Sequence, residues 1–128
     1  ASNNVFSYLK SRGIDEEIIK KCIENNLIYE EKYYHNAVFV GYDEEKNIRY
    51  AGCRSTNEKT FKADATGSDK SYSFRLESTT KTDTIYIFEG AIDALSYATL
   101  FKIYGQNYEE KSENFNIHCS NAFYDMRG

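Results

Sequence analysis

Residues 85–96 read IYIFEGAIDALS, and this stretch decides how the later part of the chain folds. Four apolar residues that favour strands stand first, and because no polar residue alternates with them they predict a buried strand. Glu89 and Gly90 end this strand, and a helical pattern begins directly after them. The stretch therefore predicts a β-strand that turns into an α-helix, with a carboxylate at the carboxyl end of the strand, where open α/β sheets bind ligands.

Glu89, Gly90 and Asp93 form the candidate site at this turn. Charged side chains are rare at the ends of core strands unless they pair or bind something, so Glu89 points to a ligand. Gly90 would let the backbone turn sharply and approach that ligand. Asp93 follows in the first helical turn, where the helix dipole alone could explain a negative charge. We expect the two carboxylates to lie near each other, partly exposed in a cleft, with basic residues facing them.

Length and composition indicate one domain, or one small domain and a fragment of another. The chain has 128 residues, of which 41% are hydrophobic and 28% charged. No apolar run approaches the roughly 18 residues of a membrane helix, so no membrane partner is expected. Three cysteines, far apart and without a CxxC pair, argue against disulfides and favour a reducing cytoplasm. His118 stands beside Cys119, but no partner pair follows at zinc spacing.

Positive charge is concentrated in the middle of a chain whose net charge is −4. Residues 49–75 hold six basic and three acidic residues, and both flanking parts are acidic. Aromatic residues alternate with these cations, as on surfaces that bind single-stranded nucleic acid, although solvated strand faces carry the same pattern. The aromatic residues are Tyr50, Phe61, Tyr72 and Phe74, and the candidate nucleic-acid-binding residues are Arg54, Lys62, Lys70 and Arg75.

Two short helices are predicted at the beginning of the chain. Asn3 or Asn4 can cap the first helix, and Gly13 ends it. Asp15 caps the second, whose apolar side chains recur at helical spacing up to Leu27. The two helices form a small hairpin.

Short strands follow this helical hairpin, and a polar loop is expected over residues 55–70. The last strand would run parallel to strand 85–88, because the intervening helix gives the length that a βαβ crossover needs. The fold class is therefore α+β: a helical hairpin and a small, mainly antiparallel sheet, followed by a partial α/β unit of the βαβ type. The predicted strands cover residues 37–40, 48–53, 72–76, 85–88 and 115–119.

Four motifs in tandem resemble the catalytic core of DnaG-type primases, and more closely the primase-like proteins of conjugative transposons and plasmids. The last motif resembles motif one of the Toprim domain, in which a hydrophobic strand is followed by Glu-Gly, two residues and Asp. In those proteins an uncharacterised leader domain precedes a Toprim-like domain. The resemblance implies a leader domain over residues 1–80 and the N-terminal part of a Toprim-like domain over 81–128. The motifs are YLKSRGI (8–14), GYDEEKNIRYAGCR (41–54), KADATGSDKSYSF (62–74) and IYIFEGAIDALSY (85–97).

The same resemblance implies Mg²⁺-dependent phosphoryl or nucleotidyl transfer on nucleic acid. Glu89 would act as general acid/base or metal ligand, with Asp93 as a second Mg²⁺ ligand, while Arg54 and Lys70 would hold the nucleic-acid backbone. The family carries a later Asp-x-Asp strand that binds Mg²⁺. No such strand follows Gly105, so this chain by itself is expected to be catalytically silent.

Three functions are consistent with these patterns. The first is the leader and partial Toprim domain of a mobile-element primase that acts in DNA replication. The second is a non-catalytic module that binds single-stranded DNA or RNA through residues 49–75. The third is a structural remnant that forms a homo-oligomer, because an incomplete parallel sheet leaves an edge strand and an apolar face to be covered.

Overall fold

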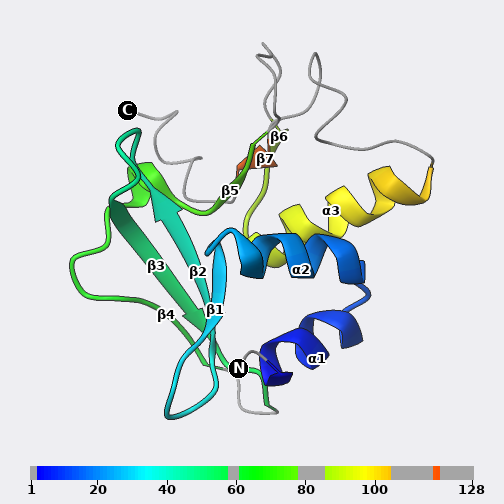
Figure 1. Ribbon diagram of the computed structural model, residues 1–128. Helices are drawn as coiled ribbons and strands as arrows, with labels where there is room; N and C mark the ends of the chain where they lie inside the picture. Colours follow the sequence, from blue (N-terminus) through cyan, green and yellow to red (C-terminus); the bar gives the residue numbers. More distant parts are fainter. Residues whose placement is uncertain (1–2, 58–60, 78–85, 105–116, 119–128) are drawn as a thin grey trace.

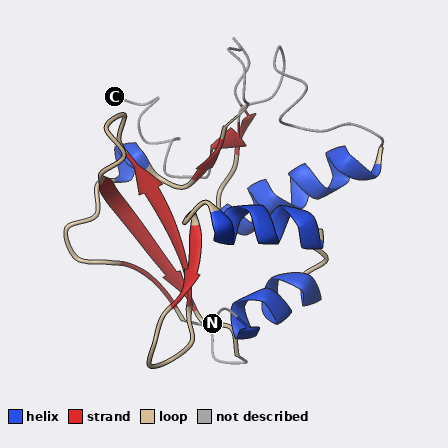
Figure 2. Cartoon of the chain, viewed as in Figure 1, coloured by secondary structure: helices blue, strands red, loops and turns tan. Residues whose placement is uncertain are grey.

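The computed structural model describes residues 3–57, 61–77, 86–104 and 117–118. Within them, three helices lie on one side of a four-stranded antiparallel sheet, and a small three-stranded sheet adjoins the third helix (Figures 1 and 2). The predicted α+β class is confirmed. The elements are α1 (Asn3–Ser11), α2 (Glu16–Glu24), α3 (Ala91–Ile103), the 3-10 helix η1 (Lys70–Tyr72), β1 (Ile28–Glu30), β2 (Ala37–Tyr42), β3 (Ile48–Arg54), β4 (Lys62–Asp64), β5 (Arg75–Leu76), β6 (Tyr86–Ile87) and β7 (Ile117–His118).

The helical hairpin forms as predicted, with one difference in how α1 is capped. Asp15 caps α2, and its carboxylate accepts hydrogen bonds from the backbone N–H groups of Glu17 and Ile18. Asn3 and Asn4, by contrast, lie inside α1 rather than before it. A carboxylate distant in sequence caps the N-terminus of α1 instead: Glu30 Oε1 accepts a hydrogen bond of 2.9 Å from the Val5 N–H. The expected cap at Asn3 or Asn4 was therefore wrong.

Both hairpin helices end in the same backbone motif. Gly13, in the left-handed conformation with φ of +84°, follows α1, and the next N–H, that of Ile14, reaches back to the Leu9 carbonyl. Asn26, which follows α2, is also left-handed, with φ of +60°, and the next N–H, that of Leu27, donates to the Cys22 carbonyl.

No helix in the described part of the chain is long and apolar enough to cross a membrane.

The first sheet has the strand order β1-β2-β3-β4 and is antiparallel throughout. Its centre is the predicted hairpin of β2 and β3, joined by a turn in which the Asp43 carboxylate accepts hydrogen bonds from the N–H groups of Glu45 and Asn47. Strand β1 was not predicted, and β4 lies within residues 55–70, which were wrongly expected to be loop. All three residues of β4 are exposed, so no alternation of apolar and polar residues marks this strand in the sequence.

The second sheet has the order β5-β7-β6, and β6 runs parallel to β7. The predicted βαβ crossover through α3 is therefore present, although Phe115, Asn116 and Cys119 of the predicted last strand lie outside the described residues. Strand β6 was expected to be buried, but Tyr86 and Ile87 are only half-buried. The strand is two residues long, and the ring of Tyr97 covers Tyr86 at 5.3 Å between ring centroids.

One buried cluster joins the helices to both sheets. Leu9 and Ile19 from the hairpin pack with Phe74, which meets the ring of Phe39 edge to face at 5.6 Å. Helix α3 adds Leu95 and its neighbours to the same cluster. Residues from before and after the predicted domain junction thus share one core. The junction itself falls within residues 78–85, which lie outside the described part, and the division into two domains remains a prediction.

Gly41 in β2 allows the backbone of Tyr72 and Ser73 to lie directly against the sheet. A Cβ atom at this position would lie 1.5 Å from the Tyr72 carbonyl oxygen and 2.8 Å from the Ser73 carbonyl carbon. Only glycine allows this backbone contact, because any side chain would occupy the space of another main chain. The contact brings the segment after η1 against β2 and places Phe74 in the core.

Candidate functional site

Glu89 and Asp93 flank the junction between β6 and α3, as their spacing predicts. Both side chains are exposed, so neither carboxylate requires a partner to offset burial. Asp93 lies in the first turn of α3, and its Oδ2 atom would be 3.9 Å from a Cβ atom built on Gly90. Among the described residues, neither carboxylate forms a hydrogen bond or an ion pair, so the prediction that basic side chains face them stays a prediction.

Gly90 is the N-cap residue of α3 and makes no side-chain cap. Its φ of −155° and ψ of 162° are extended values that any residue adopts. The space beside it is open apart from Asp93. The backbone conformation therefore does not demand glycine here, and the close approach of a ligand remains a prediction.

Among the described residues, a metal site at this turn would use these two carboxylates. In the part of the chain that the structure describes, no three His, Cys, Asp or Glu side chains gather as a metal-binding group. Mg²⁺ prefers an octahedral set of oxygen ligands and retains several waters when few protein oxygens are offered. Glu89 and Asp93 are the residues that could hold such an ion, with water as the remaining ligands.

Several cations of the basic segment face carboxylates within the chain. Lys70 Nζ lies 4.0 Å from Asp64 Oδ2, and Arg75 Nη1 lies 3.5 Å from Glu77 Oε1. The excess of positive charge in the sequence is thus partly balanced by these contacts. Of the four predicted nucleic-acid-binding residues, Arg54 and Lys62 remain without an acidic partner among the described residues.

Arg54 and Lys62 lie directly opposite each other on β3 and β4. Residues paired in this way project from the same face of a sheet. Arg54 Nε donates a hydrogen bond of 3.1 Å to the Tyr8 hydroxyl, which also accepts one of 3.1 Å from Nη1 of Arg12. We refer to Tyr8, Arg12, Arg54 and Lys62 as the basic cluster. Arg12 was missed as a binding residue, although it lies in the YLKSRGI motif.

The aromatic residues of the basic segment serve mainly in packing. Tyr50 and Phe74 are 8% and 0% exposed, and the Tyr50 hydroxyl donates to Asp64 Oδ1 at 2.7 Å. The Arg49 guanidinium covers the ring of Tyr72, with Cζ 4.4 Å from the ring centroid. Phe61 alone of the four is exposed as a large hydrophobic side chain. The expected stacking surface is therefore not formed by this set of residues.

Arg75 belongs to a different region from the basic cluster. It lines a cavity of about 550 Å³ together with Leu27, Val40, Tyr42 and Lys46. Its Nε atom is buried and has no hydrogen-bond partner in the described part of the chain. Arg54, Lys62 and Lys70 do not line this cavity.

The family described as "Protein of unknown function (DUF3991)" matches residues 7–80, which is more than half of the chain. The chain therefore belongs to this family. No curated protein and no solved structure matches it. The matched range contains the whole basic cluster and ends at residue 80, before Glu89 and Asp93.

Proposed function

We propose that this chain is a nucleic-acid-binding module whose basic cluster contacts backbone phosphates. The observation that carries this proposal is the hydroxyl of Tyr8, which accepts hydrogen bonds from the guanidinium groups of both Arg12 and Arg54. Because both nitrogens lie 3.1 Å from one oxygen, the two positive groups are close neighbours. Like charges at such separations repel, and an anion between them relieves the repulsion.

The geometry of the cluster suits a phosphate. Arg54 uses Nε to bond Tyr8, and its terminal nitrogens carry further donors in the planar fork that matches phosphate oxygens. Arg54, the last residue of β3, is half-buried and hydrogen-bonded to Tyr8 on α1, whereas Lys62 beside it is exposed. A fixed guanidinium next to a mobile ammonium provides one oriented contact and one adaptable contact, which suits sequence-independent binding.

The resemblance to mobile-element primases supports a wider role for this module. In that setting a complete Toprim domain would perform Mg²⁺-dependent nucleotidyl transfer, with Glu89 as general acid/base or metal ligand and Asp93 as a second ligand. Two positions support this role: Glu89 follows β6, a strand parallel to β7, and Asp93 lies in the first turn of α3. Nucleic-acid binding by the basic cluster does not depend on this catalytic role.

Fluorescence anisotropy with a labelled single-stranded oligonucleotide tests the binding proposal. We expect the affinity to fall steeply as salt rises, because released counterions drive the association. Arg12→Ala, Arg54→Ala and Lys62→Ala should each weaken binding and reduce the slope of log affinity against log salt by about one. Lys20→Ala, which removes the same charge from the exposed side of α2, is the matched control and should have little effect.

Two results would overturn the proposal. One is the absence of oligonucleotide binding at low salt by the wild-type chain. The other is an affinity that Arg54→Ala changes no more than Lys20→Ala does. Mg²⁺-dependent nucleotide incorporation by this chain alone would contradict the expectation that catalysis needs the complete Toprim domain.

A further inference from the structure

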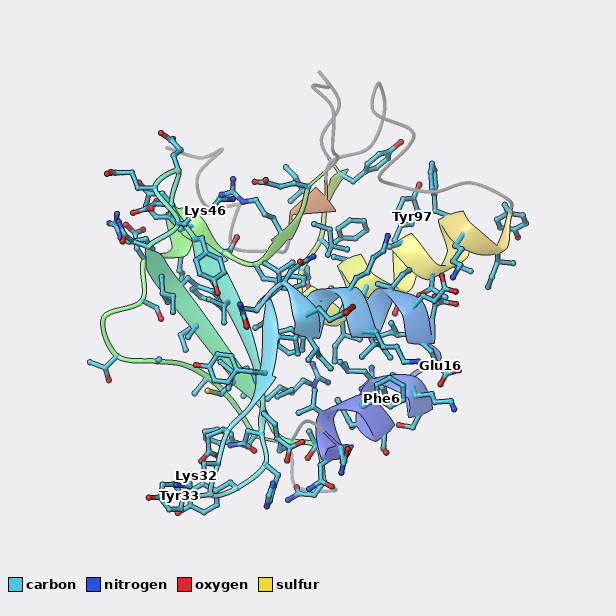
Figure 3. All side chains as sticks on the ribbon, viewed as in Figure 1. Phe6, Glu16, Lys32, Tyr33, Lys46 and Tyr97 are labelled. Atoms are coloured by element: carbon cyan, nitrogen blue, oxygen red, sulfur yellow. The ribbon has the colours of Figure 1, made fainter. Side chains whose placement is uncertain are left out.

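We propose that the turn between β1 and β2 stacks on unpaired bases, which makes the ligand a single strand rather than a duplex. This inference rests on the proposed function and names its ligand class. It starts from Tyr33 and Tyr34, whose side chains are 80% and 76% exposed. Figure 3 shows Tyr33 and its neighbour Lys32 at the tip of this turn, pointing away from the body of the molecule.

Adjacent tyrosines at this level of exposure contribute little to packing. Single exposed apolar side chains are common on protein surfaces, but a pair at the tip of a turn offers two ring faces at one place. Every base has a π-face that stacks on such rings, so recognition by stacking tolerates any sequence. Lys32 adds a positive charge beside the rings, and cations and aromatic rings together are typical of surfaces that bind single strands.

The turn is held in a defined conformation. The Glu31 carboxylate accepts hydrogen bonds from the N–H groups of Tyr33 and Tyr34 at 2.6 and 3.0 Å. The Glu31 carbonyl accepts another from the N–H of His35, a residue in the left-handed conformation. Because the backbone is already fixed, binding would order little beyond the two ring torsions of each tyrosine, and this lowers the entropy lost on association.

The turn also lies at the same end of the sheet as the basic cluster. The Thr56 hydroxyl donates a hydrogen bond of 2.9 Å to the His35 carbonyl, and Thr56 comes two residues after Arg54. Arg54 in turn pairs with Ala37, the first residue after the turn in β2. The nearby Glu30 carboxylate is hydrogen-bonded to the His35 ring and to the Val5 N–H. In this proposal, a strand reaches the two rings while its phosphates contact Arg54 and Lys62.

Single strands are selected because a duplex hides the faces of its bases inside the stack. The basic cluster reads only phosphate and does not distinguish the two forms. The tyrosine turn adds this distinction without adding sequence specificity.

The test compares the double variant Tyr33→Ala, Tyr34→Ala with the wild-type chain on three ligands. These are a single-stranded oligothymidylate, an abasic strand of the same length and a duplex. We expect the double variant to lose about fivefold or more in affinity for the oligothymidylate, since each stacked base contributes measurably to binding. Affinity for the abasic strand and for the duplex should stay unchanged.

Two further variants separate stacking from other effects. Tyr33→Phe with Tyr34→Phe should retain wild-type affinity, because the ring and not the hydroxyl stacks on the base. Tyr104→Ala is the matched control. Tyr104 is 79% exposed, and it follows α3, whose end lies far from the turn between β1 and β2 (Figure 1). A strand carrying 2-aminopurine should show fluorescence quenching by the wild type that the double alanine variant loses.

The outcomes separate this inference from the proposed function. If Arg54→Ala weakens oligothymidylate binding and the double alanine variant does not, the base-stacking inference fails and phosphate binding stands. An equal loss on the abasic strand would also overturn it. If the wild-type chain binds none of the ligands, the proposed function itself has failed.

Discussion

Lys102 Nζ lies 2.8 Å from Asp15 Oδ2, so the last turn of α3 is tied to the first turn of α2. The same carboxylate caps α2, and the backbone N–H of Asp15 donates a hydrogen bond of 3.0 Å to the Thr99 hydroxyl on α3. A cation at a helix C-terminus and an anion at a helix N-terminus are both favoured by the helix dipoles. One contact therefore fixes α3 to the helical hairpin.

This ion pair predicts how stability depends on pH. Partial burial raises the pKa of Asp15, but the hydrogen bond from Lys102 and the backbone N–H groups of Ile18 and Glu17 outweigh it and hold the pKa below its ordinary 3.8. The contribution to stability is thus fully present above 3.8 and is lost as pH falls through the lowered pKa. Lys102→Met should destabilise the chain by about 1 kcal/mol or less at neutral pH, because the pair is partly exposed.

Urea unfolding at neutral and strongly acidic pH measures this effect. The difference between wild type and Lys102→Met should shrink as Asp15 becomes protonated. It should also shrink at alkaline pH, because hydrogen bonds from Lys102 to Asp15 and Glu17 raise its pKa, and the contribution is lost as pH rises through the raised value. Asp15→Asn, which keeps a cap but removes the charge, should lower the free energy of unfolding at neutral pH by a similar amount. If the difference between wild type and Lys102→Met stays constant with pH, the ion pair does not contribute to stability.

Glu30 predicts a second effect on stability. Its side chain is only 7% exposed, and Glu30→Ala would leave the Val5 N–H at the start of α1 without its acceptor. We expect a loss of about 1–2 kcal/mol, the usual cost of removing a helix cap. Glu30→Gln keeps an acceptor oxygen and should be milder. Circular dichroism and urea unfolding measure both variants, and equal losses would mean that the charge of Glu30, rather than the cap, matters.

Gly41→Ala should destabilise the chain by about 1–3 kcal/mol or more, as overpacking does when no side chain can move aside. The atoms that a Cβ would meet belong to the backbone of Tyr72 and Ser73, which cannot rotate away. Gly90→Ser is the matched control, because it adds a cap at an open, extended position and should leave stability unchanged or slightly raised. Thermal unfolding of the two variants should therefore differ clearly in midpoint.

Glu89 and Asp93 predict a weak cation site in this chain. Two exposed carboxylates should bind a divalent cation with a dissociation constant of about a millimolar. Mn²⁺, which is paramagnetic, should broaden the amide NMR signals of residues 89–93, and Glu89→Gln with Asp93→Asn should remove the effect. The acidic turn at residues 43–45 is an internal comparison. Equal broadening at both places would show general attraction to acidic surface and no site.

Features of the fold that depend on local chemistry could be predicted from the sequence. The Asp15 cap and the end of α1 at Gly13 need only a few neighbouring residues, and both are found. The hairpin of β2 and β3 is marked by its apolar strands and polar turn. Strands β1 and β4 could not be predicted, because each is three residues long and exists through pairing with a neighbouring strand.

The candidate site shows the same division between local and tertiary effects. Arg54 and Lys62 could be predicted as binding residues from the charge of their segment. That neither has an acidic partner among the described residues depends on which strands pair, and this could not be predicted. Tyr50 and Tyr33 look alike in the sequence, yet one is buried and the other is 80% exposed. Burial of an aromatic residue is decided by the whole fold, and composition alone could not distinguish packing from stacking.

The core that α3 shares with the helical hairpin has a consequence for where this chain can be divided. The segment that defines the family ends at residue 80, yet Ala94, Leu95 and Ala98 of α3 fill the same buried cluster as Ile18 and Ile19. A chain cut at residue 80 would expose that apolar face to water and would tend to aggregate. In this chain, residues 7–80 therefore do not form a complete folding unit, because α3, which lies outside them, covers this apolar face.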